Sequence, residues 1–474
     1  MLAAAAAVSL GWALVTQDAT ALRAAPAAGG TVQAQLWPGD LVEVRGERLD
    51  FVQVYDHARE RAGYLRPAQL RPLATAPQDA PALLAVLRFL RDQPGAESLG
   101  IAYAAAYLKA VPAAALDAEP FDALGVMAER LARRASSRTG RGSESVAGQL
   151  EAVGRYGVKF TSFEREGVLQ LCYEGEAFRR VLAMKADAAA QARAVLALTR
   201  HDCIDPALPP HERPALHRWR AELLDRISPA ALLQLPETAR NRLRARRAGV
   251  WAALSFARSR EGGDAAGAAR RAIDELAAID KSAIADDNAA EIAEAGLRAA
   301  AVRQAADPVA PPTPHGLALR LAPGAPGQTC LRLVDVRQAE GAALLRRCTY
   351  ATVWPGSLRV APDGRMAVLA VQPLEGWTEL WLMRTGAQGW TVDALPPAAV
   401  EPGLGTLEFA GWVPGGTRLL VAREARVEGR LRRSFELLAL DSLQPEKQAG
   451  SPQALSAFAR WQDAQWRRHT LITR

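Results

Sequence analysis

The chain has 474 residues, 49% of them hydrophobic, and a formal net charge of +7. That length and apolar content allow two to four domains with sizeable cores and exclude global disorder. The positive charge does not indicate nucleic-acid binding. Only five of the 58 basic residues are lysines, a bias typical of a GC-rich genome, and aromatic and basic residues do not interleave as in RNA-binding segments.

Residues 1–13 are apolar and rich in alanine. Small residues at Gly11 and Ala13 suit a signal peptidase that cleaves before Leu14, although the positive charges that usually open a signal peptide are missing. No cysteine follows to carry a lipid anchor, and no later stretch reaches the ~18 continuous apolar residues of a transmembrane helix. We therefore predict a signal-peptide-like segment and a periplasmic or secreted protein without an integral membrane span. The alternative is an alanine-rich extension of a cytosolic protein.

Residues 14–73 have the alternating apolar pattern of short strands. Apolar side chains alternate around 32–36, 41–44 and 51–54, and residues 63–65 form a possible closing strand. Glycine and proline separate these runs as turns. Strands at this spacing predict a small five- or six-stranded β-barrel, because closure removes exposed sheet edges.

The same stretch resembles the bacterial SH3 family. The resemblance rests on "ALRAAP" for N-V-R-x-x-P, the "GDLVEV" strand, "DFVQV" where the family has W-x-x-V, and "GYLR" for G-W-V. Phe51 and Tyr64 stand where the family has tryptophan, which retains an aromatic ring and leaves the ligand open. Some members bind peptidoglycan or protein partners, so the resemblance implies a binding role. We select Trp37, Tyr55 and Tyr64 as the aromatic residues to test for ligand stacking, and expect at least one of them to belong to the core.

Residues 78–307 change to helical periodicity. Apolar residues at i, i+3 and i+4 spacing predict helices over 80–93, 119–135 and 236–259, among others. A β-like insert over 158–172 predicts a small hairpin. Because no repeat of fixed length occurs, we expect a helical domain rather than a solenoid. A proline-rich linker over 308–314 follows it, since proline interrupts helix.

The four cysteines form two local candidate pairs. Cys172 and Cys203 flank an apparent helical segment, while Cys330 and Cys348 lie on two β-like runs joined by a short turn. Four cysteines permit three pairings, and this is the most local one. An exported protein would form it in an oxidising compartment. The alternative is four buried free thiols in a cytosolic protein.

Residues 315–474 are β-like. Two similar segments start at Trp354 and Gly411, each with a Pro/Gly turn followed by two apolar strands. The first contains "APDGRMAVLAV" and "ELWLM", which resemble blades of TolB-like and WD40-like β-propellers. About 160 residues are few for four or more blades of ~40 residues each. The resemblance therefore implies a partial propeller, a β-sandwich or a blade array completed by a partner.

No motif for catalysis, metal or cofactor binding is present. His211 and His217 stand at i and i+6, so they do not share a helix face as zinc ligands at i and i+4 do. Cys203 near His201 is better explained by a disulfide than by a nucleophile with its base. The basic run 240–249 predicts a solvated helix face, with contact to anionic envelope polymer or lipid head groups as the functional alternative.

Together these observations predict a multidomain α+β protein: a signal-like segment 1–13, an SH3-like barrel 14–73, a helical domain 78–307, a linker 308–314 and a propeller-like β domain 315–474. We expect an exported, non-enzymatic envelope protein that contacts peptidoglycan or an envelope protein. The alternative is an envelope hydrolase whose catalytic residues lie in the helical domain.

Overall fold

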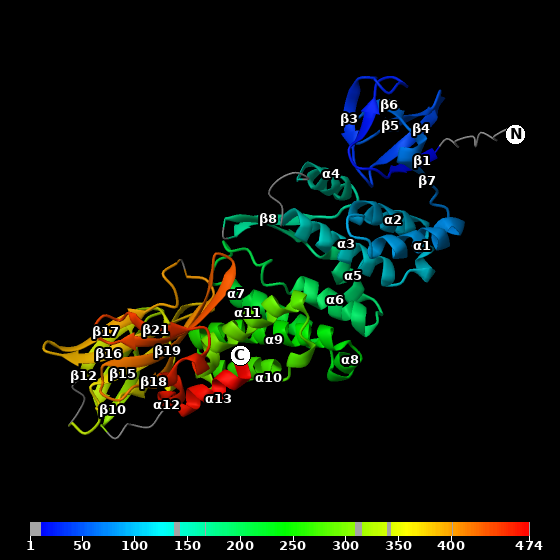
Figure 1. The fold of residues 1–474 in the computed structure, drawn as a ribbon. Coiled ribbons are helices and arrows are strands. Elements are labelled where there is room, and N and C mark those ends of the chain that lie inside the picture. The colour runs from blue at the N-terminus through cyan, green and yellow to red at the C-terminus, as the bar shows by residue number, and fades with distance from the viewer. Residues whose placement is uncertain are drawn as a thin grey trace. The chain divides into compact units, whose positions relative to one another are not determined.

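The computed structural model describes residues 11–136, 143–165, 167–308, 315–338, 343–400 and 402–473. The chain forms two compact units, Met1–Ala207 and Leu208–Arg474. Each unit contains helices and antiparallel sheet, which makes this a multidomain α+β protein (Figure 1). Residues 1–10 of the signal-like segment and residues 309–314 of the linker lie outside the described residues.

The first unit opens with a seven-stranded antiparallel sheet in the order β3-β2-β6-β5-β4-β1-β7. Its strands are β1 Gly11–Val15, β2 Thr20–Arg23, β3 Val32–Leu36, β4 Leu41–Arg48, β5 Phe51–Asp56, β6 Arg61–Leu65 and β7 Leu70–Leu73. The strands predicted around 32–36, 41–44, 51–54 and 63–65 are therefore confirmed. The sheet has seven strands rather than the five or six expected.

This sheet curls around one core. Fully buried side chains from strands across the whole sheet, including Leu22, Leu36, Val54 and Leu65, meet in a single cluster. A flat sheet of this width could not bring its outer strands to a shared core. The first strand begins at Gly11, three residues before the predicted start of the barrel.

Helices and one hairpin complete the first unit. They are α1 Ala80–Arg91, α2 Glu97–Ala110, α3 Glu119–Ser136, α4 Ser143–Gly154, β8 Phe160–Arg165, β9 Val168–Tyr173, α5 Glu176–Ala183 and α6 Ala188–Leu198. The hairpin β8–β9 confirms the β-like insert predicted over 158–172. Apolar faces of the helices pack around Ile101, Met127 and Leu131, which are fully buried.

Polar contacts join the sheet to these helices. The carboxylate of Asp40, 1% exposed, accepts a hydrogen bond from Arg155 at 2.5 Å and another from the backbone N–H of Trp37 at 2.9 Å. The hydroxyl of Tyr156 donates to the carbonyl of Gly39 at 2.6 Å. The residues that follow α4 therefore hold the loop after β3 in place.

The second unit opens with helices (green in Figure 1). They are α7 Arg213–Asp225, α8 Pro229–Leu233, α9 Glu237–Glu261, α10 Ala265–Ala277 and α11 Asp286–Val302. The long α9 packs against α7, α10 and α11. It ends at Glu261, and the next residue, Gly262, caps it with a φ of 74°, a left-handed conformation that glycine adopts without a Cβ clash.

Antiparallel sheets follow these helices. The strands are β10 Leu317–Pro323, β11 Thr329–Asp335, β12 Ala343–Thr349, β13 Thr352–Val353, β14 Arg359–Val360, β15 Met366–Leu374, β16 Trp377–Gly386, β17 Gly389–Leu395, β18 Gly405–Trp412, β19 Arg418–Val427, β20 Arg430–Ala439 and β21 Pro445–Ala449. The strands β10 to β12 form a three-stranded sheet, and the other nine form a second one. Within the larger sheet, a short parallel contact between β16 and β18 joins two antiparallel groups. The two similar sequence segments supply one group each.

Two short helices end the described chain, α12 Ser456–Trp461 and α13 Ala464–Thr473. Both contact β18, and α13 also contacts α10 and α11. Among the helices of the described residues, none combines the length and apolar character that a membrane span requires.

Both predicted disulfides are present. Cys172 of β9 is bonded to Cys203, which follows α6, with their Cα atoms 5.8 Å apart. Cys330 and Cys348 stand directly opposite each other on β11 and β12 and are bonded. Each bridge lies within one unit.

The division of the chain differs from the predicted one. Helices α1 to α6 belong with the N-terminal sheet, and α7 to α11 belong with the C-terminal sheets, so the boundary falls at residues 207 and 208. The stretch 78–307 is helical in large part, but it does not form one domain. Apolar periodicity identifies the buried face of a helix without identifying what covers that face.

Candidate binding surface

A row of outward side chains crosses three neighbouring strands of the N-terminal sheet. Trp12 of β1 pairs with Glu43 of β4, and Glu43 pairs with Tyr55 of β5. Their sequence neighbours Ala13 and Val54 point into the core. Because successive side chains alternate between faces, all three row residues lie on the outer face.

Two further residues complete this surface. The ring centroid of His57 lies 5.4 Å from that of Trp12 and 4.8 Å from that of Tyr55. The guanidinium carbon of Arg45 lies 4.0 Å from the centroid of the Tyr55 ring, a cation–π contact. We call Trp12, Glu43, Arg45, Tyr55 and His57 the aromatic surface.

The carboxylate of Glu43 contacts both Arg45 and His57 of the aromatic surface. Arg45 Nη2 and His57 Nε2 each lie 2.9 Å from Glu43 Oε2. The hydrogen bond from Arg45, followed by that from His57, lowers the pKa of Glu43. Glu43 therefore stays ionised at neutral pH and orients the Arg45 guanidinium and the His57 imidazole beside the aromatic rings.

The aromatic surface is open to solvent. Trp12 is 43% exposed, an unusual position for a side chain of this size and apolar character. An aromatic ring that is partly exposed and held in place by a strand can stack on a flat ligand without a change in the protein's conformation. The adjacent carboxylate, guanidinium and imidazole provide hydrogen-bond donors and acceptors for polar groups of that ligand.

The three aromatic residues selected from the sequence occupy different environments. Tyr55 belongs to the aromatic surface. Tyr64 of β6 pairs with Gln53 of β5, in another row of the same sheet, and is partly exposed. Trp37 is 7% exposed and its indole lies against Gly148 of α4, so we assign it to packing.

Trp12 was missed because its apolar, alanine-rich surroundings resemble a signal peptide. The alternation in "GWALV", with Trp12 facing opposite to Ala13, is the local signal that indicates a strand. Glu43 and Arg45 show the same alternation in "LVEVR".

The basic run 240–249 is part of the helix α9 rather than a solvated face. Arg246 and Arg247 are 6% and 7% exposed. Arg246 pairs with Glu291, and Arg247 donates to the carbonyls of Leu224 and Ile227. These arginines connect α9 to its neighbours, so the expectation of a solvated face is wrong for them.

The histidines considered for zinc do not form a site. His217 is 1% exposed and its Nε2 lies 2.9 Å from Glu375 Oε2, whereas His211 is exposed. No group of three or more candidate ligands that could hold a metal ion occurs among the described residues.

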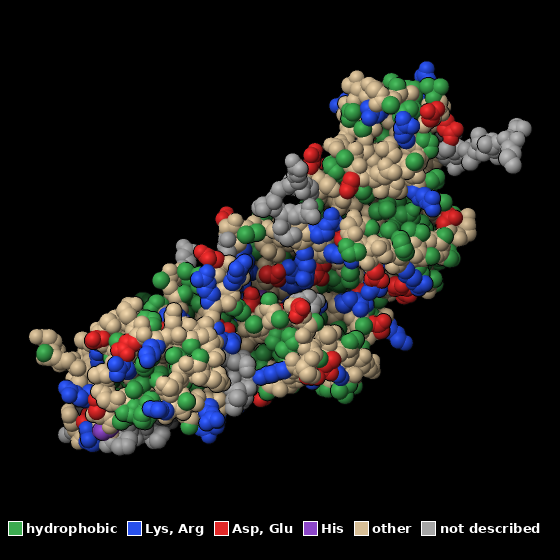
Figure 2. Space-filling model, in the orientation of Figure 1, with side chains coloured by type: hydrophobic (Ala, Val, Ile, Leu, Met, Phe, Trp, Pro, Cys, Tyr) green, Lys and Arg blue, Asp and Glu red, His purple; other side chains and the backbone are tan. Residues whose placement is uncertain are grey.

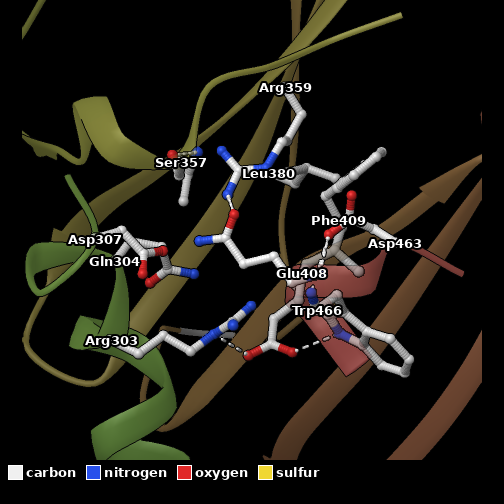
Figure 3. A pocket seen from close by; sticks show the side chains of 13 residues that line it. Arg303, Gln304, Asp307, Ser357, Arg359, Leu380, Glu408, Phe409, Asp463 and Trp466 are labelled. Carbon is white, nitrogen blue, oxygen red and sulfur yellow. Dashed lines mark hydrogen bonds and ion pairs between the residues drawn. The ribbon is translucent and has the colours of Figure 1, made fainter. Parts of the chain in front are cut away.

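A polar cavity of about 30 Å³ lies between the end of α11, β18 and the start of α13 (Figure 3). Inside it, Glu408 pairs with Arg303 at 3.2 Å and accepts a hydrogen bond from Trp466 Nε1 at 3.1 Å. Arg359 donates to the Gln465 side chain at 2.5 Å. A cavity of this size has room for about one or two water molecules and none for a substrate, so we assign this cluster to packing of the C-terminal helix.

Acidic and basic side chains are intermixed on the face in Figure 2, with no single large basic area there. No protein-family model, no curated protein and no solved structure matches the chain.

Proposed function

We propose that this is an exported protein of the bacterial envelope, whose N-terminal sheet is an SH3-like barrel that binds peptidoglycan through the aromatic surface. The observation that carries the proposal is the exposed row of Trp12, Glu43 and Tyr55, flanked by Arg45 and His57. The sequence motifs that resemble the bacterial SH3 family lie in this same sheet.

The chemistry of the aromatic surface favours peptidoglycan. Indole and phenol rings stack on the apolar faces of sugar rings, and both side chains keep a polar group for hydrogen bonding. Arg45 suits the carboxylates of the stem peptides, because a guanidinium donates two parallel hydrogen bonds to a carboxylate. The Glu43 carboxylate can accept hydrogen bonds from the amino groups of the stem peptides. A protein partner would more often need a continuous apolar core in the interface, which three aromatic rings among charged groups do not provide.

The disulfides support export. Disulfides persist in oxidising compartments and are rare in the cytosol of most organisms. Two formed pairs, with no free cysteine among the described residues, fit a protein that folds in the periplasm or outside the cell.

The C-terminal sheets support a scaffolding role. We propose that they are blade-like units of a partial propeller: β10–β12 form one, β15–β17 another and β18–β21 a third. Antiparallel blades that do not close on themselves expose strands, and such strands are natural sites for pairing with a partner.

The alternative, an envelope hydrolase, finds less support. Of the two pockets described here, the polar one is too small for a substrate and the other, in the second unit, is lined mainly by apolar side chains. Hydrolysis needs a positioned acid, base or nucleophile in a cleft.

The proposal is tested by co-sedimentation with purified insoluble peptidoglycan. Trp12→Ala and Tyr55→Ala should each reduce the sedimented fraction several-fold. Phe89→Ala is the matched control, because Phe89 is a 66% exposed aromatic on α1 outside the aromatic surface. Arg45→Gln should also weaken binding. This milder variant keeps the test valid if Trp12→Ala disturbs the strand.

Equal sedimentation of the wild type and the three aromatic-surface variants, at equal thermal stability, would contradict the proposal. If the wild type does not sediment with peptidoglycan but captures one envelope protein, and Trp12→Ala abolishes this capture, the ligand of the aromatic surface is a protein and not peptidoglycan.

A further inference from the structure

Three arginines form a row across the three-stranded sheet of the second unit. Arg320 of β10 lies directly opposite Arg332 of β11, and Arg332 lies directly opposite Arg346 of β12. All three are exposed. The row is on the outer face of the sheet, because the neighbouring Leu331 and Leu333 point to the other face, where they are fully buried in the core. We call Arg320, Arg332 and Arg346 the arginine row.

The charge of the arginine row is not balanced by a carboxylate among the described residues. The strands β10 to β12 contain one acidic residue, Asp335, which belongs to the other face by alternation and pairs with Arg337 at 2.8 Å. In the part of the chain that the structure describes, no guanidinium of the arginine row forms an ion pair or a hydrogen bond. The three positive charges therefore remain available to a ligand.

The larger sheet of the same unit shows the usual arrangement of such charges. There Glu424 of β19 lies directly opposite Arg433 of β20, and the two side chains pair at 2.8 Å. Opposite charges across a strand pair stabilise a sheet, whereas like charges directly opposite each other destabilise it. The arginine row therefore lowers the stability of its sheet, and a local cost of this kind is typical of a functional surface.

A disulfide fixes the strands that carry the arginine row. Cys330 and Cys348 lie on the same outer face, each two residues from an arginine of the row, and their bond joins β11 to β12. Side chains directly opposite each other have Cβ atoms about 5 Å apart, so the row extends for about 10 Å across the three strands. A row of cations on a rigid sheet can meet several negative groups at once without ordering the backbone.

The shape and composition of this face select among anions. Guanidinium groups bind phosphate through two parallel hydrogen bonds. The arginine row lines neither of the two pockets described above, so we expect an extended anion rather than a small enclosed one. Nucleic acid is disfavoured, because β10 to β12 contain no aromatic side chain on which bases could stack. An array of phosphates in a plane, as on an anionic phospholipid membrane, fits an exposed row on the face of a sheet.

We propose that the outer face of β10 to β12 docks on an anionic phospholipid surface through the arginine row. Each basic residue near such a surface strengthens binding by about fivefold. Three arginines therefore give a weak, reversible attachment. The inference is independent of peptidoglycan binding by the first unit.

The test is co-sedimentation of the full chain with vesicles of phosphatidylglycerol and phosphatidylcholine in equal amounts, beside vesicles of phosphatidylcholine alone. The wild type should sediment only with the anionic vesicles at low salt, and no longer near 1 M salt, where the Debye length is about 3 Å. The double variant Arg332→Gln with Arg346→Gln should bind the anionic vesicles about twentyfold more weakly. The matched control is Arg270→Gln with Arg430→Gln, which removes the same charge from exposed arginines outside the row and should bind nearly as the wild type does.

Arg332→Glu separates the binding role from a structural one. A carboxylate between the two remaining guanidinium groups should raise the melting temperature and abolish vesicle binding. Equal sedimentation of the wild type and these row variants, no sedimentation of the wild type with anionic vesicles, or an equal loss in the control pair would overturn the proposal. Binding of a DNA oligonucleotide that is lost in the row variants, without binding of vesicles, would replace the lipid surface by nucleic acid.

Discussion

The indole of Trp37 lies so close to Gly148 of α4 that a Cβ at position 148 would overlap the ring. Trp37 follows β3 and Gly148 is a buried residue of α4, so this contact fixes the N-terminal sheet against a helix of the same unit. An aromatic residue that the sequence suggested for ligand stacking thus has a packing role.

Gly148→Ala should destabilise the first unit. The added methyl group forces the indole to move in a packed interior, which costs about 1–3 kcal/mol. Gly154→Ala is the matched control in the same helix, because a Cβ there meets no atom within 4 Å. It should be neutral or stabilising by up to about 1 kcal/mol through helix propensity. Urea unfolding of both variants tests this, and equal stabilities for the two would contradict the contact.

Loss of the Cys172–Cys203 bridge should cost more than loss of Cys330–Cys348. The first closes a separation of 31 residues and the second one of 18. Restriction of the unfolded chain predicts about 3–4 kcal/mol for the first and about 3 kcal/mol for the second. Paired Cys→Ala variants, compared by urea unfolding, measure the difference. Non-reducing peptide mapping of protein produced in a bacterial periplasm checks the pairing, and a bridge between the two units would contradict it.

The free energy of unfolding should fall on acidification, because Glu375 becomes protonated. Burial raises the pKa of this carboxyl, but His217, Arg298 and Arg220 outweigh burial and lower the pKa from an ordinary 4.5 to about 2. Because the folded-state pKa is depressed, the ionised carboxylate contributes stability above pH 4.5 and loses it as pH falls toward 2.

Glu375→Gln keeps a hydrogen-bond acceptor for His217 and removes the charge. The variant should be less stable than the wild type by on the order of 2–3 kcal/mol at pH 5.5, and by roughly half as much at pH 3. Urea unfolding at both pH values gives the difference, and a gap that does not change with pH would argue against the assigned ion pair.

If the N-terminal segment is removed on export, the mature chain should begin at or before Gly11. Gly11, Trp12 and Ala13 pair with β4, and Ala13 is 1% exposed. Cleavage before Leu14 would remove three of the five residues of β1 and, with them, the indole of the aromatic surface. N-terminal sequencing of exported protein decides this, and a mature end at Leu14 in stable, folded protein would contradict the role of β1.

Much of the local structure could be predicted from the sequence. Alternation identified β3 to β6, and the disulfide pairs followed because each bridge joins segments that are close in the chain. The boundary between the units could not be predicted, because helix periodicity does not show whether α7 packs on α6 or on the later helices and sheets. Arg246 and Arg247 were predicted on a solvated face because a charged run is usually solvated. Their burial could not be foreseen, since their partners come from distant residues such as Glu291 and Leu224.

Four of the five residues of the aromatic surface could be recognised only from the fold. Tyr55 could be selected as an aromatic residue of a predicted strand. His57 follows it by two residues, but Trp12 comes from a separate part of the chain, and only the pairing of β1 with β4 and of β4 with β5 brings Trp12, Glu43 and Tyr55 together. Register of this kind is determined by the hydrophobic core on the other face of the sheet.

Hydrogen–deuterium exchange of the full chain, with and without soluble peptidoglycan fragments, tests the central claim most directly. The account predicts slower exchange in peptides that cover Gly11–Val15, Leu41–Arg48 and Phe51–Asp56, and unchanged exchange in α1, which carries the control residue Phe89. Protection confined to other parts of the chain, or no protection at fragment concentrations that saturate binding, would contradict it.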